Sequence, residues 1–307
     1  MLLIADGGER AGLGHISRSS ALTIALRRRG CEVEARVYRG DGPIERDGVI
    51  WKPVEDLALP GDADVLVLDS YKVPAATASS IAGSTPLVVM HDYGEPPPTA
   101  ALVVSVAGSR SDRPPMLVGP AYACLRPSYW GLARRRVADE VRSVLVVTGS
   151  GGGGFGGELA CALQEALPEA GVRLVRGPYA PSAPPGVTVL EAPESLLEPL
   201  LAADLVVGGA GQTILEALAT GAPSVALPLV DNQLRQARAL ADEDAVCLVD
   251  QPTVEAAVDA ARGLAVDGVT RRRLAERAQA TVDGLGALRV ASHVATLVRG
   301  RPDPPVS

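Results

Sequence analysis

A glycine-rich loop containing one histidine is the first place where this chain could carry out chemistry. Residues 6–18 read D-G-G-E-R-A-G-L-G-H-I-S-R, follow a short apolar run and lead into a helical pattern. Gly12 and Gly14 would let the backbone approach a ligand closely, although the G-x-G-x-x-G spacing of dinucleotide-binding proteins is missing. His15 would lie in the first helical turn, where the positive end of the helix dipole disfavours imidazolium. A neutral imidazole there is a candidate general base near pH 7.

Arg18 follows His15 by about one helical turn, so both side chains could address one ligand. The alternative is that His15 is only a polar residue at a helix start and Arg18 a solvated surface charge. His91 follows an apolar run, V-V-M-H-D-Y, and would face the same rim of a sheet. His293 falls within a late helical pattern and is expected to be structural. His15 is therefore the histidine we place in the site.

A second loop, residues 206–223, connects a buried strand to a helix and reads V-V-G-G-A-G-Q-T-I-L-E-A-L-A-T-G-A-P. Backbone N–H groups at such a helix start bind phosphate readily. Glu216 could accept two hydrogen bonds from a ribose diol. Alternatively, it stands three residues after Thr213, the spacing of a capping box, and would bond back to the helix start. We interpret the loop as nucleotide-binding through Gly209, Ala210, Gly211, Gln212, Thr213 and Glu216.

Two further segments follow strand patterns. Residues 228–237 read P-L-V-D-N-Q-L-R-Q-A, in which Asp231 is most simply an N-cap. Asn232 and Gln233 would then occupy the first turn and point to the same crevice as the nucleotide loop. The run T-G-S-G-G-G-G-F-G-G, residues 148–157, resembles a phosphate cradle but lacks the G-K-[S/T] ending of a P-loop. We expect this run to border the site.

The loops connect short runs of Val, Leu and Ile that alternate with helical patterns. The runs are continuous, as strands buried on both faces require. Strand–helix alternation predicts α/β architecture with parallel sheets. Helices are expected at 16–29, 158–167, 213–220, 234–242 and 287–299, and strands at 2–5, 65–69, 87–90, 102–106, 143–148, 172–175, 187–190, 204–207, 224–227 and 245–249.

A break in this alternation divides the chain. Residues 119–139 carry two prolines, several aromatic residues and three successive arginines, as an interdomain connection would. We expect an N-terminal domain over residues 1–130 and a second domain over residues 138–285, both doubly wound. A helix over residues 286–300 could pack on either domain, and residues 301–307 would form a tail.

Composition excludes several classes of function. The 307 residues are 47% hydrophobic, which gives ample core material, and 36 acidic against 29 basic residues give a net charge of −7. A bulk electrostatic footprint for nucleic acid is therefore absent. The four cysteines form no C-x-x-C pair, so no zinc site or disulfide framework is indicated. Neither a signal peptide nor an apolar run long enough for a membrane span is present, which predicts a cytoplasmic protein.

Six motifs stand in a fixed order along nearly the whole chain. They are G-L-G-H-I-S-R (12–18), L-D-S-Y (68–71), L-V-G-P-A-Y-A-C-L-R-P (117–127), G-G-A-G-Q-T-I-L-E (208–216), V-D-N-Q (230–233) and D-G-L-G-A-L-R-V (283–290). The set resembles the nucleotide-sugar hydrolases of nonulosonic acid biosynthesis, whose named member cleaves UDP-2,4-diacetamido-2,4,6-trideoxy-β-L-altropyranose on the pseudaminic acid route. Spore-coat polysaccharide proteins and the lipid II N-acetylglucosaminyltransferase are more distant relatives of that family.

The resemblance implies a GT-B fold, in which two Rossmann-like domains face each other across a cleft and the C-terminal domain holds the nucleotide. His15 matches the family's proposed base, Glu216 its ribose-binding acid, Asn232 a polar residue near the sugar and diphosphate, and Tyr71 an aromatic residue on the N-terminal side. The sequence departs from the family at residues 5–10 and 149–154, which border the sugar pocket. Residues expected to bind the substrate are Gly12, Gly14, Arg18, Asp69, Tyr71, Asn232 and Gln233.

These observations together predict an inverting hydrolase of nucleotide-sugars that needs neither metal nor cofactor. Water deprotonated by His15 would attack C1 of the sugar and release UDP, or another nucleoside diphosphate, and a free amino or deoxy sugar. The backbone of residues 208–213 would stabilise the leaving diphosphate, with Arg18 as a further donor. A product for nonulosonic acid or surface polysaccharide biosynthesis is implied.

Two alternatives remain open at this stage. A glycosyltransferase on the same GT-B fold would use His15 to activate an acceptor hydroxyl in place of water. If that acceptor were membrane-bound, the R-R-R run at residues 27–29 is a candidate contact, although such a run also suits a solvated helix end. The third possibility is a non-catalytic nucleotide-sugar binding protein. In every case the partner is a small nucleotide-sugar, and no nucleic acid or integral membrane association is expected.

Overall fold

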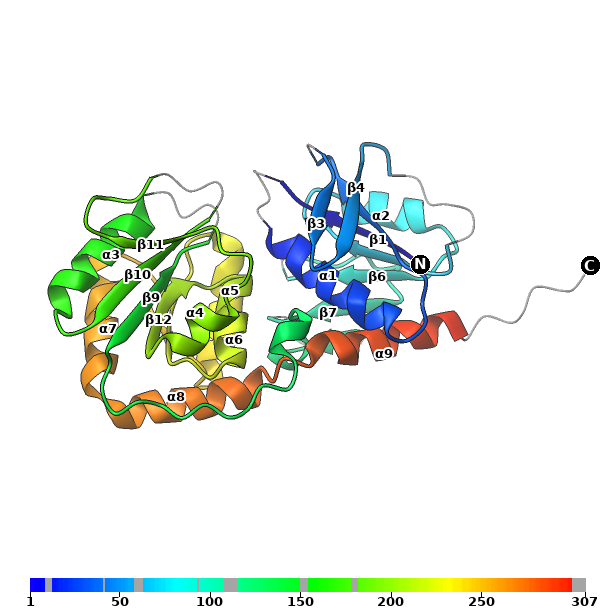
Figure 1. Ribbon diagram of the computed structural model, residues 1–307. Coiled ribbons are helices and arrows are strands. Elements are labelled where there is room, and N and C mark those ends of the chain that lie inside the picture. Colours follow the sequence, from blue (N-terminus) through cyan, green and yellow to red (C-terminus); the bar gives the residue numbers. More distant parts are fainter. Residues whose placement is uncertain are drawn as a thin grey trace, which may run out of the picture. The chain divides into compact units, whose positions relative to one another are not determined.

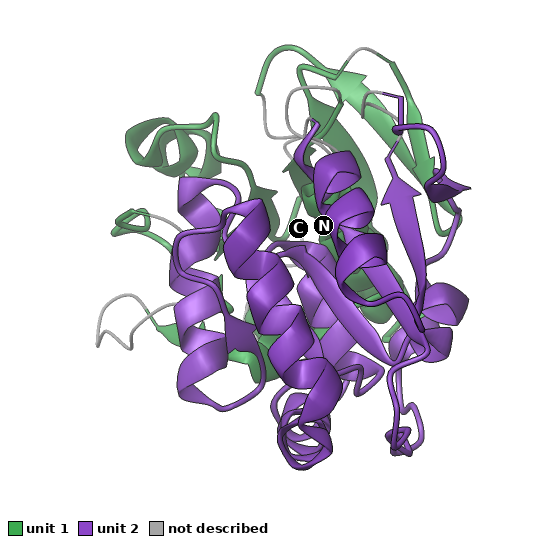
Figure 2. Ribbon diagram, turned by 90° about the vertical axis from the view of Figure 1, so that its left-hand side faces the viewer, with its two compact units in different colours: residues 1–127, 285–307 green, residues 128–284 purple. Residues whose placement is uncertain are grey.

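The chain forms two compact units, each an open α/β sheet. Unit 1 comprises residues 1–127 together with residues 285–307, and unit 2 comprises residues 128–284 (Figure 2). The α/β prediction with parallel sheets is confirmed in both units. The computed structural model describes residues 1–8, 13–40, 42–57, 63–92, 94–107, 115–149, 154–177 and 182–299.

Unit 1 contains an eight-stranded sheet in the order β3-β4-β2-β1-β5-β6-β7-β8 (Figure 1). Its neighbours pair in parallel except β3 and β4, which form an antiparallel hairpin. The elements of unit 1 are β1 (Leu2–Asp6), α1 (Gly14–Arg27), β2 (Glu34–Tyr38), β3 (Ile44–Arg46), β4 (Val49–Val54), β5 (Leu66–Asp69), α2 (Ala75–Ala82), β6 (Leu87–Met90), β7 (Leu102–Ser105), β8 (Met116–Val118), the 3-10 turn η1 (Pro120–Tyr122) and α9 (Gly286–Arg299).

Four adjacent strands of unit 1, β1, β5, β6 and β7, are buried along their whole length, as their continuous apolar runs predict. Helix α1 packs on β1 and lies beside α9, so the C-terminal helix belongs to this unit (Figure 1). Trp51 of β4 is fully buried and donates from Nε1 to Ser20 Oγ of α1 at 2.9 Å. Helix α2 packs into a core that includes Leu2 and Ile4.

Strands β2, β3, β4 and β8 were not predicted from the sequence. The burial of β4 alternates between buried and exposed residues, and β3 has no buried residue at all. A strand that covers only one face of the core needs apolar residues only on that face, so the long apolar run is missing. The sequence signal that identified β1, β5, β6 and β7 is therefore absent from these four strands.

Unit 2 contains a six-stranded parallel sheet in the order β11-β10-β9-β12-β13-β14. Helix α3 packs against β9, β10 and α7, while α5 contacts β12 and α8 (Figure 1). The elements are the 3-10 turn η2 (Pro127–Tyr129) at the unit boundary, β9 (Ser143–Val147), α3 (Phe155–Ala166), β10 (Gly171–Arg176), β11 (Thr188–Glu191), α4 (Leu197–Ala202), β12 (Leu205–Gly209), α5 (Gln212–Ala219), β13 (Ser224–Leu227), α6 (Asp231–Asp242), β14 (Cys247–Leu248), α7 (Val254–Val266) and α8 (Gly268–Thr281).

The segment expected to connect the domains is bound to unit 2 by side-chain hydrogen bonds, among them those of Arg135, Gln279 and Arg271. Arg135 donates to the carbonyl oxygens of Leu200, at 3.0 Å, and Ala203. Gln279 of α8 accepts from the Arg135 backbone N–H at 2.9 Å. Arg271, 1% exposed, donates to the Asp139 carbonyl at 2.6 Å and to the end of α7. The boundary expected at residue 138 therefore leaves out chain that packs as part of unit 2.

Candidate active site

The candidate site in unit 1 lies where β1, β5 and β6 end and α1 begins. In open parallel sheets this edge is where ligands bind, because loops leaving the strands gather there. The start of α1 packs closely onto the sheet: a Cβ atom at Gly7 would lie 2.9 Å from Ile16 Cγ1 and 3.0 Å from Val37 Cγ2. This close approach brings His15 to the carboxyl end of β5.

His15 is hydrogen-bonded to a buried carboxylate. Its Nδ1 lies 2.6 Å from Asp69 Oδ1, and the two residues are 8% and 0% exposed. At this distance the carboxylate accepts the Nδ1 proton, which leaves Nε2 as the proton-accepting nitrogen. A histidine oriented in this way by a carboxylate is the usual arrangement of a general base.

Asp69 remains ionised because of its neighbours. Burial alone would raise the pKa of the Asp69 carboxyl, but the Arg18 guanidinium and the His15 ring hold that pKa well below its usual range. Ser19 Oγ adds a hydrogen bond to Oδ2 at 2.8 Å. Asp69 was predicted to bind substrate. In the structure its carboxylate bonds to the side chains of His15, Arg18 and Ser19.

Arg18 is also occupied by protein carboxylates. Its Nε and Nη2 donate to the two oxygens of Asp69 at 2.8 and 2.6 Å, and its Nη1 donates to Asp92 Oδ2. Burial works against the charged guanidinium, yet the two carboxylates raise the pKa of Arg18 well above its ordinary value. The sequence suggested that Arg18 would contact the substrate, whereas in the structure its guanidinium bonds to these two carboxylates and its Nη2 lies 3.3 Å from His15 Nδ1.

Tyr71 packs against the imidazole from the turn after β5. Its ring meets the His15 ring edge-to-face, with centroids 4.5 Å apart and an interplanar angle of 80°. The Tyr71 hydroxyl donates to Asp92 Oδ2 at 3.2 Å, although the residue as a whole is 44% exposed. Desolvation of the hydroxyl and the nearby Asp92 raise the pKa of Tyr71 to about 12, so it is a neutral donor at physiological pH.

Two buried carboxylates of this site, Asp6 and Asp92, were missed in the sequence analysis. Asp6 is the last residue of β1 and accepts from the Ser70 hydroxyl at 2.7 Å and the Tyr71 backbone N–H at 2.8 Å. Asp92 follows β6 by two residues and is 7% exposed. Both stand at carboxyl ends of strands, and that position was the signal that could have identified them.

The remaining expectations for unit 1 have mixed outcomes. Gly14 is the first residue of α1, whereas Gly12 lies outside the described residues. His91 was expected at the same rim and directly precedes Asp92, and its buried Nε2 has no hydrogen-bond partner within the described part of the chain. Of the glycine run 148–157, residues 150–153 lie outside the described residues, and α3 begins at Phe155.

The predicted nucleotide loop of unit 2 joins β12 to α5. Gly208 packs tightly against β9, because a Cβ atom there would lie 2.6 Å from the Val147 carbonyl oxygen. The Ala210 backbone N–H bonds to the Leu227 carbonyl of β13 at 2.9 Å. Gln236 of α6, which the sequence analysis missed, donates from Nε2 to the carbonyls of Ala210 at 2.7 Å and Gly211 at 3.0 Å. The loop is thus held by hydrogen bonds to β13 on one side and to α6 on the other.

Two capping expectations in unit 2 are wrong. Helix α5 begins at Gln212, so Thr213 lies inside the helix and cannot be the N-cap of a capping box with Glu216. The N-cap of helix α6 is Val230, and no side chain among the described residues caps this helix start. Asp231 is the first residue inside the helix. Asp231 instead places a negative charge in the first turn, where the helix dipole favours it.

The expected ligand-binding residues of unit 2 gather around these two helix starts. Glu216 is 5% exposed on α5. Asn232 and Gln233 lie half-buried in the first turn of α6, and Gln233 Oε1 accepts from the Leu229 backbone N–H at 3.0 Å. Gly209, Ala210, Gly211, Gln212 and Thr213 form the end of β12, the connecting turn and the start of α5. Their contact with a nucleotide remains a prediction.

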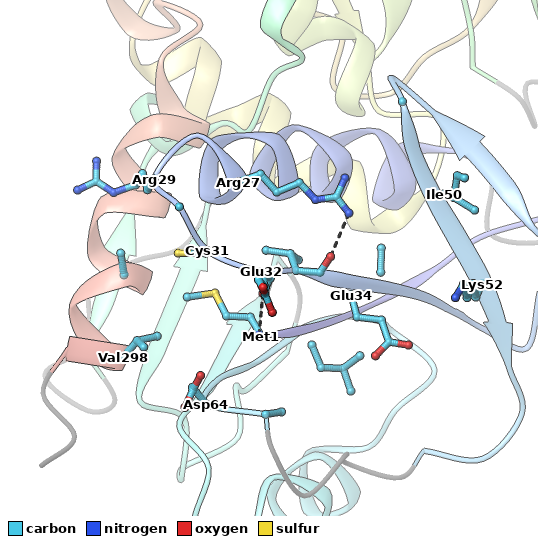
Figure 3. Close-up of a pocket in the computed structure, with 17 residues that line it drawn as sticks. Met1, Arg27, Arg29, Cys31, Glu32, Glu34, Ile50, Lys52, Asp64 and Val298 are labelled. Atoms are coloured by element: carbon cyan, nitrogen blue, oxygen red, sulfur yellow. Dashed lines mark hydrogen bonds between the residues drawn. The ribbon is translucent and has the colours of Figure 1, made fainter. Parts of the chain in front are cut away.

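A cavity of about 890 Å³ lies elsewhere in unit 1, at the edge of the sheet where β1 and β2 begin (Figure 3). Its lining includes Arg27, Arg29, Glu32 and Lys52, and shares no residue with the His15 site. Arg27 donates to the Val33 carbonyl at 3.0 Å, as Figure 3 shows. The cavity therefore lies at the opposite end of the strands from the edge where open parallel sheets bind their ligands.

Metal-binding clusters and membrane-spanning helices are both missing from the part of the chain that the structure describes. Within the described ranges, no group of three or more His, Cys, Asp or Glu side chains is arranged to bind a metal ion. None of the helices in those ranges has both the length and the apolar character that crossing a bilayer requires.

Comparison with known proteins identifies the fold. No protein-family profile and no curated protein matches the chain. The spinosyn rhamnosyltransferase SpnG complexed with thymidine diphosphate aligns with a TM-score of 0.66 at 17% identity, over 96% of this chain and 99% of that chain. The chain has the GT-B fold.

Other GT-B structures align over similar lengths. MurG of Acinetobacter baumannii has a TM-score of 0.59 at 19% identity, covering 98% of this chain and 99% of its own. The calicheamicin glycosyltransferase CalG4 has a TM-score of 0.60 at 17% identity, covering 99% of both chains. The GT-B prediction is therefore confirmed for the fold, and the choice of reaction depends on the site.

Proposed function

We propose that the chain is an inverting glycosyltransferase that moves a sugar from a nucleoside diphosphate to an acceptor hydroxyl. The single observation that carries this proposal is the hydrogen bond between His15 and the buried Asp69 at the start of α1. The GT-B fold supports it, because SpnG is named as a rhamnosyltransferase and is complexed with thymidine diphosphate, and CalG4 is named as a glycosyltransferase. This was the alternative to hydrolysis in the sequence analysis, and the comparisons favour it over the hydrolase.

In the proposed reaction, Nε2 of His15 removes the proton of the acceptor hydroxyl. The oxygen attacks C1 of the sugar as the bond from C1 to the diphosphate oxygen breaks, which inverts the configuration at C1. Asp69 stabilises the imidazolium that forms and keeps its Nδ1 proton in place. General base catalysis of this kind contributes about 10²–10⁴-fold to the rate.

We propose that the loop from Gly209 to Thr213 receives the diphosphate and that Glu216 binds the ribose. Backbone N–H groups at the start of α5 would stabilise the charge that develops on the leaving group. Gln236 supports this role by donating to the carbonyls of Ala210 and Gly211, which fixes the turn that carries these N–H groups. Because Arg18 is bonded to Asp69 and Asp92, charge stabilisation is assigned to this backbone.

The proposal is tested by incubating the protein with UDP-sugars and dTDP-sugars, each with and without a panel of hydroxylated acceptors. A transferase releases nucleoside diphosphate faster when a suitable acceptor is present and forms a glycoside with inverted configuration, seen by NMR. Binding of UDP or dTDP without release from any donor would instead support the non-catalytic binding protein.

Hydrolysis is the second candidate, and the six ordered motifs shared with nucleotide-sugar hydrolases favour it. Water would then occupy the place of the acceptor hydroxyl, and His15 would keep the same role. The same incubations carried out in ¹⁸O-labelled water separate the two reactions. A hydrolase forms free sugar with ¹⁸O at C1 at a rate that added acceptors do not raise. The amino or deoxy sugar of the pseudaminic acid route is the first donor to test.

A further inference from the structure

Asp92 is a buried carboxylate whose hydrogen bonds reach two neighbours of His15. Its Oδ2 accepts from Arg18 Nη1 and, at 3.2 Å, from the Tyr71 hydroxyl. Its Oδ1 faces the Val106 backbone N–H at 3.4 Å. A carboxylate that is 7% exposed and bonded on both oxygens is held in one place.

The contacts of Asp92 reach His15 by two routes. Through Arg18, Asp92 is linked to both oxygens of Asp69, which holds the imidazole at Nδ1. Through Tyr71, it is linked to the aromatic ring that packs edge-to-face on the imidazole. Both routes orient the same ring, so loss of Asp92 would release two constraints on His15 at once.

The charges of the cluster formed by His15, Arg18, Asp69 and Asp92 point to a second effect. If Arg18 and Asp69 were the only charged neighbours of His15, they would form a neutral pair. The positive charge of Arg18 would then cancel the negative charge by which Asp69 favours imidazolium. Asp92 adds a second negative charge to the one guanidinium, so the cluster is net −1 with a neutral His15 and neutral overall with imidazolium. The buried cluster is therefore electrically balanced in the state that exists after proton transfer.

Within the described residues, the titratable groups Cys124, Tyr71 and Asp6 lie near this cluster. Cys124, which follows η1, is buried, and burial raises the pKa of its thiol to about 12, so it is neutral at the working pH. The Tyr71 hydroxyl, with its pKa raised to about 12, is neutral as well. Asp6 at the end of β1 accepts from the Ser70 hydroxyl and the Tyr71 backbone N–H. These groups are the same before and after proton transfer, so they leave the difference between the two states unchanged.

We propose that Asp92 is a positioning residue for the base: it fixes Arg18 and Tyr71 around His15 and supplies the negative charge that balances imidazolium. This inference rests on the proposed function, because it assigns His15 as the group that accepts a proton. It goes further in assigning Asp92, Arg18 and Tyr71 to one unit that acts through the imidazole.

The test uses the full chain with Asp92→Asn, Asp92→Glu and Tyr71→Phe. With the donor that wild type turns over, Asp92→Asn should lower kcat by on the order of 10-fold and change KM less than about twofold. The acidic limb of kcat/KM against pH should move to lower pH, because the cluster has lost a negative charge. Tyr71→Phe leaves the charge of the cluster unchanged and should leave the acidic limb at the wild-type pH. Asp92→Glu retains the negative charge and should also show the acidic limb at the wild-type pH.

A second readout needs no activity. In ¹⁵N spectra of histidine-labelled protein recorded against pH, the change in the ring resonances of His15 should occur at lower pH in Asp92→Asn than in wild type. Glu34→Gln removes an exposed carboxylate of β2 that pairs with Arg36, and it should leave those resonances unchanged.

The two readouts separate the possible failures. If no donor is turned over but the His15 resonances shift as expected, the proposed function fails while the coupling of Asp92 to His15 stands. If Asp92→Asn leaves both the acidic limb and the ¹⁵N titration of His15 where wild type has them, the inference about Asp92 is overturned. If Asp92→Asn does not fold, Asp92→Glu decides: loss of the wild-type acidic limb with charge retained contradicts the charge argument.

Discussion

At the scale of single residues, the site depends on which partner each polar group has. Sequence spacing identified His15 and Arg18 at one helix start and assigned both to the substrate. The structure assigns Arg18 to Asp69 and Asp92 and gives His15 a carboxylate that lies 54 positions away in sequence. Spacing predicts which side chains share a helix face, but it cannot predict a partner brought in by another strand.

Asp69→Asn tests the orientation of His15. The neutral amide of asparagine lacks the negative charge with which Asp69 accepts the Nδ1 hydrogen bond. It therefore leaves the positive charge of the developing imidazolium without a neighbouring negative charge from this position. We expect kcat to fall by about 10²–10⁴-fold while nucleotide affinity stays within about twofold. Steady-state kinetics and calorimetric titration with nucleoside diphosphate measure the two quantities. An Asp69→Asn enzyme with wild-type kcat would show that the carboxylate does not serve the base.

The same carboxylate makes stability depend on pH. The pKa of Asp69 is lower in the folded protein than the value of about 3.9 in the unfolded chain. Its contribution is therefore fully present above pH 4 to 5 and is lost as the pH falls toward the folded value. We expect the difference in Tm between wild type and Asp69→Asn to be largest near pH 6 and smaller at pH 3. A difference that grows on acidification has the wrong sign for this account.

At the scale of elements, the chain's own pattern is informative wherever strands are buried on both faces. Strands such as β6 (Leu87–Met90) and β13 (Ser224–Leu227) have the bounds predicted from their apolar runs. Strand β4 was not predicted because half of its residues are exposed to solvent, so its sequence lacks a continuous apolar run. Helix α5 begins at Gln212 and α6 at Asp231, so Thr213 and Asp231 lie inside their helices, and for this reason both capping assignments failed.

Close packing between β12 and β9 gives a prediction at this scale. Gly208→Ala would place a Cβ atom 2.6 Å from the Val147 carbonyl oxygen, and a strand backbone cannot move away without disturbing its neighbours. We expect a loss of about 1–3 kcal/mol in the free energy of unfolding, measured by denaturant titration. Gly263→Ala is the control: it lies within α7 with no atom near the new Cβ, and should stabilise by about 0.5–1 kcal/mol.

The loop between β12 and α5 depends on Gln236. Gln236→Leu removes the donor to the Ala210 and Gly211 carbonyls and leaves two polar groups without that partner. We expect the affinity for nucleoside diphosphate to fall by about tenfold, which is about 1.4 kcal/mol. The control, Arg238→Gln, removes an exposed ion pair with Asp250 from the same helix and should leave affinity unchanged. If Gln236→Leu binds nucleoside diphosphate as tightly as Arg238→Gln does, a role for the loop in nucleotide binding is contradicted.

At the scale of the whole molecule, the alternation of strands and helices predicted two α/β domains, and the fold agrees. The boundary is harder to predict, because the chain leaves unit 1 at residue 127 and returns to it at residue 285. A return of this kind produces no compositional break, and α9 could have packed on either domain as far as its own sequence shows. Assigning α9 to unit 1 requires its contact with α1.

The division into units also separates the two halves of the proposed chemistry. Unit 1 carries the proposed base with its neighbouring carboxylates, and unit 2 carries the loop proposed to hold the nucleotide. A change at the proposed base in unit 1 should therefore lower turnover and leave nucleotide binding unchanged, whereas a change in the loop of unit 2 should weaken nucleotide binding. This separation follows from the proposal that the base acts on the attacking oxygen while the diphosphate is held by other groups.

The most direct measurement compares nucleoside diphosphate release by wild type, His15→Asn and Glu216→Gln, together with the affinity of each protein for the diphosphate. We expect His15→Asn to lose at least about 10²-fold in kcat with unchanged affinity. Because Glu216 is proposed to bind the ribose, the main effect of Glu216→Gln should be a lower affinity for nucleoside diphosphate. If His15→Asn releases nucleoside diphosphate at the wild-type rate, His15 is not the base and the account is contradicted.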